Sequence, residues 1–322
     1  MVKPSINIII LIALLNFSCY RNKTNQNNNT SSTAKPQGIH AAFYNSNGSK
    51  IALSTDKGKL YVTDDTFGVL GQVDAHEGNA TSSFFSLNDK FIITGGKDKL
   101  LKIWQADNLL PVKSYNFNLH AFTSVYGYNT IAACGLGGKV ILFNISKNIE
   151  QEITLEKEGA YFLYYIEPDS ALLISSALKG FEVSVTSGAI LHQYNGHTRP
   201  AYCIMPAHSK KLVVTASADS AVRVFDRYTE KLIYKSAALD GQAFVATFGA
   251  ADKVIAASTS SGSIYIFDTT LSNVLLKIAA FSTRVNTIHF SPDGTKILAG
   301  SEGGGAKIFS AVNGELLNEF KY

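Results

Sequence analysis

The chain has 322 residues and a formal charge of +4; 17% of its residues are charged and 46% are apolar. The positive charge is spread along the chain with no block of five like charges, so nothing electrostatic favours nucleic-acid binding. After the N-terminus, no run reaches the roughly 18 apolar residues that a membrane-spanning helix needs.

Residues 1–18 have the pattern of an export signal. Lys3 and the α-amine form a short positive region, and Ile6–Leu15 is apolar except for Asn7. The small residue Ser18 ends the segment. We therefore expect this segment to be a signal peptide.

The segment resembles a bacterial lipoprotein signal peptide, in which the cysteine after the cut is acylated. The resemblance implies lipid attachment at Cys19. Asn16 stands where the usual motif has leucine, and Leu15 lies one residue earlier, so the match follows a relaxed form of the motif. Plain secretion and an uncleaved anchor are the alternatives.

Residues 19–36 are expected to form the lipid-attachment cysteine and a flexible linker. The stretch from Tyr20 to Pro36 is dominated by Asn, Ser, Thr, Lys and Gln and has no apolar periodicity. Such a composition buries too little surface to fold. A flexible linker of this length would span roughly 20–25 Å, which predicts a folded domain held near a membrane.

Residues 37–322 contain one pattern seven times. Each copy has an apolar strand, a polar turn, a second apolar strand, a short turn with Asp or Gly, and a third strand that ends in most copies in an aromatic or apolar residue. The third strands are expected to end at Thr63, Trp104, Phe143, Val183, Phe225, Phe267 and Phe309. Because these steps are 39–42 residues long, the pattern predicts an all-β, seven-bladed propeller of four-stranded antiparallel blades.

The repeats resemble the WD-repeat (WD40) β-propeller family over residues 37–322. Blade two has Ala75-His76, Thr94, Asp98 and a third strand ending at Trp104. Blade five has Gly196-His197, Thr215, Asp219 and Phe225, and blade seven has Phe290-Ser291-Pro292-Asp293-Gly294 between its first two strands. The last blade holds its own outer strand, Glu315–Phe320, whereas residues 30–38 are polar and include Pro36. We therefore expect ring closure by packing of blade one on blade seven rather than by a shared blade.

His76, Thr94 and Asp98 contain the three groups of a hydrolase triad. The family resemblance instead implies a structural hydrogen-bond chain running from Asp98 through His76 and Thr94 to Trp104. His197, Thr215 and Asp219 repeat the set in blade five, where Phe225 replaces the tryptophan. Recurrence at one register favours architecture over catalysis, so no catalytic residue is predicted.

The resemblance also implies a binding surface at the top mouth of the central channel. His40 and His120 are expected just inside their first strands, with equivalents at Thr81, Ala160, Tyr202, Phe244 and Asn286. Arg199 and Arg284 lie in the loops entering blades five and seven. The candidate top-face residues are His40, His120, Tyr202, Phe244, Asn286, Arg199 and Arg284. Aromatic and arginine side chains would suit a partner protein or peptide, although strand starts also carry such residues for packing.

No cysteine or histidine cluster has metal-ligand spacing, and no phosphate-binding glycine loop precedes a helix, so no metal or cofactor is predicted. Cys134 and Cys203 lie in apolar strands of different blades and are expected to be buried, unpaired thiols. The sequence predicts a non-catalytic scaffold or adaptor in the cell envelope, anchored to a membrane through Cys19. The alternatives are a secreted protein, a propeller enzyme or small-ligand binder that uses the channel, and an intracellular WD-repeat scaffold.

Overall fold

The computed structural model describes residues 37–320, except 87, 120, 127–129, 136–137, 146, 156–158 and 167–170; the side chains of residues 121–126 and 250 are also not described. The predicted signal peptide and linker, residues 1–36 with Cys19, lie outside the described residues, as does His120. Within the described part, no helix is long and apolar enough to cross a membrane.

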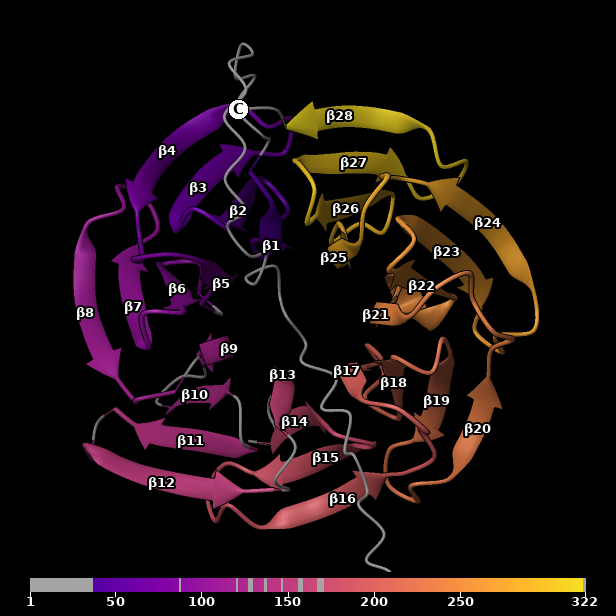
Figure 1. The fold of residues 1–322 in the computed structure, drawn as a ribbon, viewed down its shortest axis with the longest axis horizontal. Coiled ribbons are helices and arrows are strands. Elements are labelled where there is room, and N and C mark those ends of the chain that lie inside the picture. The colour runs from indigo at the N-terminus through magenta and orange to yellow at the C-terminus, as the bar shows by residue number, and fades with distance from the viewer. Residues whose placement is uncertain are drawn as a thin grey trace, which may run out of the picture. The chain divides into compact units, whose positions relative to one another are not determined.

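Seven four-stranded antiparallel sheets are arranged around a central channel, which confirms the predicted propeller (Figure 1). The inner strands are β1 (Ile39–Tyr44), β5 (Ala80–Phe85), β9 (Ala121–Tyr126), β13 (Ala160–Ile166), β17 (Ala201–Pro206), β21 (Ala243–Phe248) and β25 (Val285–Phe290). The second strands are β2 (Lys50–Thr55), β6 (Phe91–Gly96), β10 (Thr130–Gly135), β14 (Ala171–Ser176), β18 (Leu212–Ser217), β22 (Val254–Thr259) and β26 (Lys296–Ser301).

The third strands are β3 (Lys59–Asp64), β7 (Leu100–Gln105), β11 (Lys139–Asn144), β15 (Lys179–Ser184), β19 (Val222–Asp226), β23 (Ser263–Asp268) and β27 (Ala306–Ser310). The outer strands are β4 (Val69–Asp74), β8 (Pro111–Asn116), β12 (Ile149–Thr154), β16 (Ile190–Tyr194), β20 (Leu232–Lys235), β24 (Val274–Ala279) and β28 (Leu316–Phe320). A short 3₁₀ turn, η1 (Ala250–Asp252), precedes β22.

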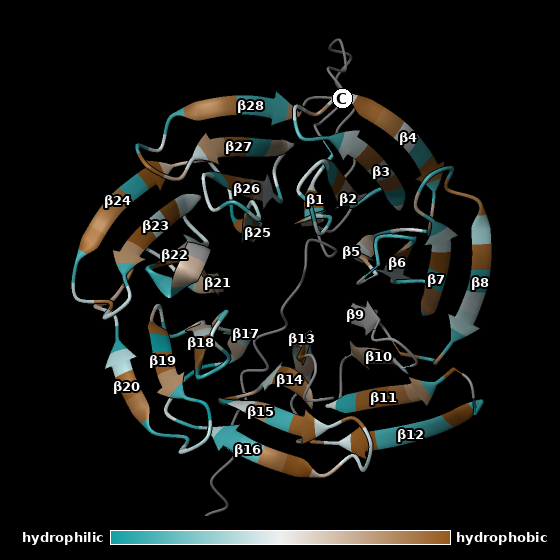
Figure 2. Cartoon of the chain, turned by 180° about the vertical axis from the view of Figure 1, so that it is seen from behind, coloured by the Kyte–Doolittle hydropathy of each residue, from teal (hydrophilic) through white to brown (hydrophobic). Residues whose placement is uncertain are grey.

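Burial follows each strand's place in its blade. The second and third strands are almost wholly buried, and every residue of β14 is buried, because a neighbouring sheet covers each face. This explains their enrichment in Ile, Leu and Val. The outer strands are largely exposed and carry apolar residues near their starts, visible as brown segments in Figure 2.

Blade seven consists entirely of residues 285–320, with β28 as its own outer strand, as predicted. The seam with blade one is a shared apolar cluster that joins Ile39 and Leu53 to Leu298 and Phe320. The Phe320 ring meets that of Tyr61 edge-on at 5.4 Å. The described residues therefore close the ring by packing; residues 28–36, which would complete a shared blade, lie outside them.

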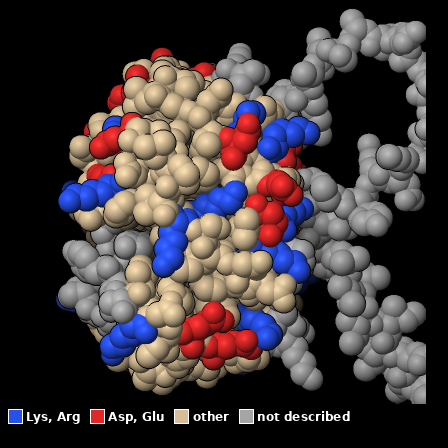
Figure 3. All heavy atoms as spheres, turned by 90° about the vertical axis from the view of Figure 1, so that its left-hand side faces the viewer, with Lys and Arg blue, Asp and Glu red and all other residues tan. Residues whose placement is uncertain are grey.

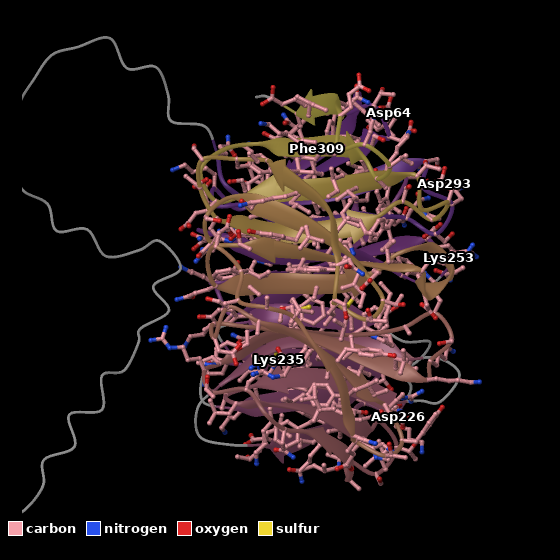
Figure 4. The ribbon with its side chains drawn as sticks, turned by 90° about the vertical axis from the view of Figure 1, so that its right-hand side faces the viewer. Asp64, Asp226, Lys235, Lys253, Asp293 and Phe309 are labelled. Atoms are coloured by element: carbon pink, nitrogen blue, oxygen red, sulfur yellow. The ribbon has the colours of Figure 1, made fainter. Side chains whose placement is uncertain are left out.

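The propeller has two distinct faces. We call the face that holds the starts of the inner strands the top face and the opposite one the bottom face. Figure 4 shows the bottom-face turn residues Asp64, Asp226, Lys253 and Asp293 on one side and Lys235, at the end of β20, toward the other. Figure 1 is viewed onto the top face and Figure 2 onto the bottom face.

Candidate functional site

The blade-two set forms one continuous hydrogen-bond chain. Trp104 Nε1 donates to Thr94 Oγ1 over 2.9 Å, and Thr94 Oγ1 lies 2.8 Å from His76 Nε2. His76 Nδ1 is 2.9 Å from Asp98 Oδ1. Thr94 is fully buried, and burial lowers the pKa of His76, which keeps the ring neutral. A hydroxyl held between an indole and an imidazole has no path to a substrate, so this geometry fits a blade lock rather than a triad.

Glycine is required beside this chain. A Cβ on Gly96 would lie 2.3 Å from His76 Nδ1 and 2.7 Å from Asp98 Oδ1. Glycine at position 96 is therefore explained by close packing of the histidine ring.

Blade five contains the same chain with a different last member. His197 Nε2 lies 2.7 Å from Thr215 Oγ1, and its Nδ1 lies 3.1 Å from Asp219 Oδ2. Arg223, which the sequence analysis did not single out, contacts His197 and donates to Asp219 Oδ2 over 2.8 Å. Burial alone would raise the pKa of Asp219, but the His197 hydrogen bond and the Arg223 charge hold it below its ordinary value. Arginine thus ties the carboxylate in a blade that lacks tryptophan.

A β-bulge interrupts the start of every inner strand, and its extra residue lies at the top mouth of the channel. The bulge residues are His40, Thr81, Phe122, Tyr161, Tyr202, Phe244 with Val245, and Asn286. Five of the predicted positions are among them: His40, Thr81, Tyr202, Phe244 and Asn286.

The assignments of His120 and Ala160 to this register are wrong. The bulge residue is Phe122 in blade three and Tyr161 in blade four, and Ala160 is fully buried. The expected register assumed connections of equal length in every blade, but two connections are shorter. Three residues link β9 to β10 where five link β1 to β2, and two link β14 to β15 where three link β2 to β3.

The bulge residues of blades four to six and Arg284, which directly precedes β25, form a continuous set of contacts, which we call the aromatic arc: Tyr161, Tyr202, Phe244 and Arg284. The Tyr161 and Tyr202 rings meet edge-on at 5.9 Å. Tyr202 stacks on Phe244 at 4.7 Å, and the Arg284 guanidinium lies 4.7 Å from the Phe244 ring centre. These contacts hold a row of flat side chains in fixed positions.

Hydrogen bonds extend the arc to blade one. Arg284 Nε donates to Asn286 Oδ1 over 2.8 Å, and Asn286 Nδ2 donates to the Ile39 carbonyl over 2.8 Å. Next to it, Asn79 Nδ2 donates to His40 Nε2 over 2.9 Å. Burial, with the nearby charges of Lys97 and Arg284, lowers the pKa of His40 to about 4, so the ring is neutral and is no general acid at neutral pH.

The predicted cations occupy different positions. Arg284 is partly buried in the arc and pairs with Glu302 Oε2 at 3.3 Å. Arg199 is exposed, yet its charge acts on Tyr202 together with that of Arg284. On the side shown in Figure 3, lysine and arginine lie interspersed with aspartate and glutamate.

Within the described residues, no group of three or more His, Cys, Asp and Glu side chains could hold a metal ion. Cys134 and Cys203 are both buried, and neither forms a disulfide. Burial raises the pKa of the Cys203 thiol to about 12, which leaves it protonated and unreactive.

Three segments match the model of the WD domain, G-beta repeat: residues 68–105, 188–226 and 274–310. Each runs from one blade's outer strand through the next blade's third strand, and they cover the predicted motifs of blades two, five and seven. The chain therefore carries WD40 repeats in three places.

The curated relatives are distant. The mouse protein "Serine-threonine kinase receptor-associated protein" is 22% identical over 162 residues, 50% of this chain and 46% of that protein. The Dictyostelium discoideum protein "Probable inactive serine/threonine-protein kinase lvsG" is 23% identical over 142 residues, 42% of this chain and 6% of that protein. The chain thus spans less than half the length of these relatives.

Among solved structures, the computationally designed Ika8 protein superimposes with a TM-score of 0.70, covering 89% of this chain and 88% of its own at 17% identity. This likeness concerns the fold alone.

Proposed function

We propose that this protein is a non-catalytic WD-repeat propeller that acts as a scaffold or adaptor, binding a protein or peptide through its top face while tethered to a membrane of the cell envelope. The observation that carries the proposal is the aromatic arc. WD-repeat propellers typically mediate protein–protein interaction, and the three matched repeats support the same role here.

The arc has the composition of an interaction hot spot. Tyr, Trp and Arg supply most of the binding energy in protein interfaces, usually from a few partly buried positions. Tyr161, Tyr202 and Arg284 are partly buried, and Phe244 is 7% exposed. Ring stacking already fixes the side chains, so binding orders little that was mobile. With Arg284 in it and the charge of Arg199 acting on Tyr202, the arc suits a segment with an apolar anchor and an acidic group.

The predicted tether would attach to the same face. The Gln37 carbonyl accepts from Gly305 N over 3.4 Å, and the Gly38 carbonyl accepts from Asp56 N over 2.9 Å. Both donors lie in the turns between second and third strands, on the top face. A linker ending at Gln37 would keep the arc within reach of membrane-associated partners, which supports an envelope role.

Crosslinked affinity capture from native envelopes tests the binding proposal, with the full-length protein as bait. We expect one dominant partner that is lost in Arg199→Ala/Arg284→Ala and kept in Lys211→Ala/Lys253→Ala. The control removes two exposed lysines from blades five and six. The test variant removes the exposed Arg199 and the partly buried Arg284 from the entries to blades five and seven. Equal capture by both variants, or capture of no partner, would contradict a top-face adaptor.

Membrane fractionation tests the tether separately. We expect the full-length protein in the membrane fraction and Cys19→Ala in the soluble fraction, with residues 1–18 removed from the native protein. A soluble wild-type protein that keeps residues 1–18 would instead support the intracellular alternative.

A further inference from the structure

The channel has a second opening, on the bottom face, that widens into a cavity of about 550 Å³. In the described part its walls come from six blades, with Phe43, Tyr164, Met205, Thr247 and His289 among the lining residues. The lining residues lie at the opposite end of the inner strands from the aromatic arc. Cavities of this size usually enclose one small molecule.

One register of the inner strands supplies the deeper wall, and we call it the lower ring. Its described members, each four positions after the strand's first residue, are Phe43, Phe84, Tyr164, Met205, Thr247 and His289, and all of these except Phe84 line the cavity. The Phe43 ring lies 4.1 Å from Phe84 and 3.7 Å from His289, between centres. Tyr164, Met205 and Thr247 come from blades four to six. The rings of Phe43 and His289 therefore form one side of the cavity, and these three side chains form the other.

His289 is the polar group of this wall. Its ring nitrogens have no hydrogen bond to the residues that the structure describes, and its ring lies against that of Phe43. Burial lowers the pKa of His289 to about 3, so a neutral imidazole faces the cavity with one donor and one acceptor. Next to it in the lining, the Tyr44 hydroxyl is buried without a partner in the described part.

Charged groups occur only at the edge of the described lining. The Asp89 carboxylate already accepts from Asn45 Nδ2 over 3.2 Å and from Ser46 Oγ over 2.5 Å. Lys210 and His208 come from the loop after β17, and His208 Nδ1 is 3.1 Å from Asp252. A ligand in the deeper part would therefore have no counter-ion, and an unpaired charge there would be costly.

We propose that the bottom end of the channel binds a small, neutral, planar aromatic molecule, with its ring against Phe43 and His289 and a polar group hydrogen-bonded to His289. This site is independent of the proposed top-face function. The aromatic wall provides the stacking surface, and the unpaired imidazole provides the polar contact that gives the site its specificity.

Indole is a suitable probe because it is neutral, planar and carries one N–H donor. Indene has the same shape without that donor. Binding of each to the full-length protein is measured by equilibrium dialysis, with saturation-transfer NMR identifying the bound ring. For a ligand of this size we expect an indole dissociation constant on the order of 1 mM.

Two variants test separately whether the probes occupy the cavity and whether indole hydrogen-bonds to His289. Met205→Trp fills the cavity from the wall opposite Phe43 and should weaken both probes at least ~10-fold. Its control, Leu191→Trp, adds the same ring on the exposed outer strand β16 and should bind as wild type. His289→Phe keeps a ring but removes the polar atoms, so it should weaken indole about 5-fold and leave indene unchanged.

The folded state of each variant is checked by thermal unfolding before binding is compared. The proposal is overturned if indole does not bind, or if Met205→Trp binds it as Leu191→Trp does. Equal weakening of indole and indene by His289→Phe would refute the hydrogen bond to His289.

Discussion

A buried ion pair joins blades four and five and should be essential to stability. Glu182 of β15 and Arg227, which follows β19, are 3% and 1% exposed. Arg227 Nη2 donates to Glu182 Oε1 over 2.6 Å, and Nε donates to Oε2 over 2.9 Å. The Tyr194 hydroxyl lies 3.0 Å from both Glu182 Oε2 and the Arg227 carbonyl oxygen. The carboxylate is thus fully hydrogen-bonded between two sheets.

Glu182→Gln keeps the size of the side chain but leaves the Arg227 guanidinium buried without a neutralising carboxylate. Removal of one partner from a buried pair costs about 3–5 kcal/mol, which should lower the melting temperature by about 5–10 °C. Urea and thermal unfolding at pH 7, followed by far-UV circular dichroism, measure the loss.

Two controls test whether the loss of stability arises from the burial of the ion pair and from the charge left unpaired. Asp107 pairs with Lys50 at 3.1 Å on the surface, where its side chain is 89% exposed, so Asp107→Asn should change the free energy of unfolding by about 0–1 kcal/mol. Glu182→Met/Arg227→Met removes both charges and should cost less than Glu182→Gln. If Glu182→Gln is no more destabilising than Asp107→Asn, the burial argument is wrong.

Three further outcomes are expected. Thr94→Val should destabilise the protein by on the order of 2 kcal/mol, and more than Thr215→Val, because only blade two loses an indole partner as well as a histidine partner; urea unfolding compares them. Gly96→Ala should lower the melting temperature, since its Cβ would lie 2.3 Å from a ring nitrogen of the neighbouring histidine. Burial lowers the pKa of His40 to about 4 and of His289 to about 3, from 6.5. The unfolded chain therefore binds protons to these rings more tightly than the folded protein does. The free energy of unfolding should be retained above pH 6.5 and fall as the pH drops from 6.5 toward 4. At pH 5 the loss should be about 2 kcal/mol for each ring. Urea midpoints across this range, and a flatter profile in His40→Gln/His289→Gln, check the last prediction.

The blade number and the strand order could be predicted from the sequence because packing between sheets repeats. Every second and third strand meets a sheet on both faces, so each blade shows the same apolar runs, such as Lys139–Phe143 and Ser263–Phe267. The hydrogen-bond chains of blades two and five were found for the same reason. His76 and His197 each precede their threonine by 18 residues.

The residues that the sequence analysis missed depend on local counts or on contacts between blades. Phe122 and Tyr161 were missed because connections shorter by two residues and by one moved the bulge register relative to the third strands. Arg223 and Arg227 lie within or just after the same strand as ordinary surface-type residues. Only the fold shows that one binds Asp219 within its blade and that the other binds Glu182 across the seam.

The channel separates residues that hold the fold from residues that can serve function. Six inner strands begin with an apolar residue that the structure shows to be fully buried: Ile39, Ala80, Ala160, Ala201, Ala243 and Val285. The bulge residue beside each lies at the top mouth of the channel, and there the blades differ, from His40 to Tyr161 to Asn286. The lower ring differs in the same way, from Phe43 to Met205 to His289. Residue chemistry varies between blades in these two rings, whereas the buried strand starts are all apolar, so the proposed protein partner of the top mouth and the proposed ligand of the bottom cavity concern separate surfaces of one propeller.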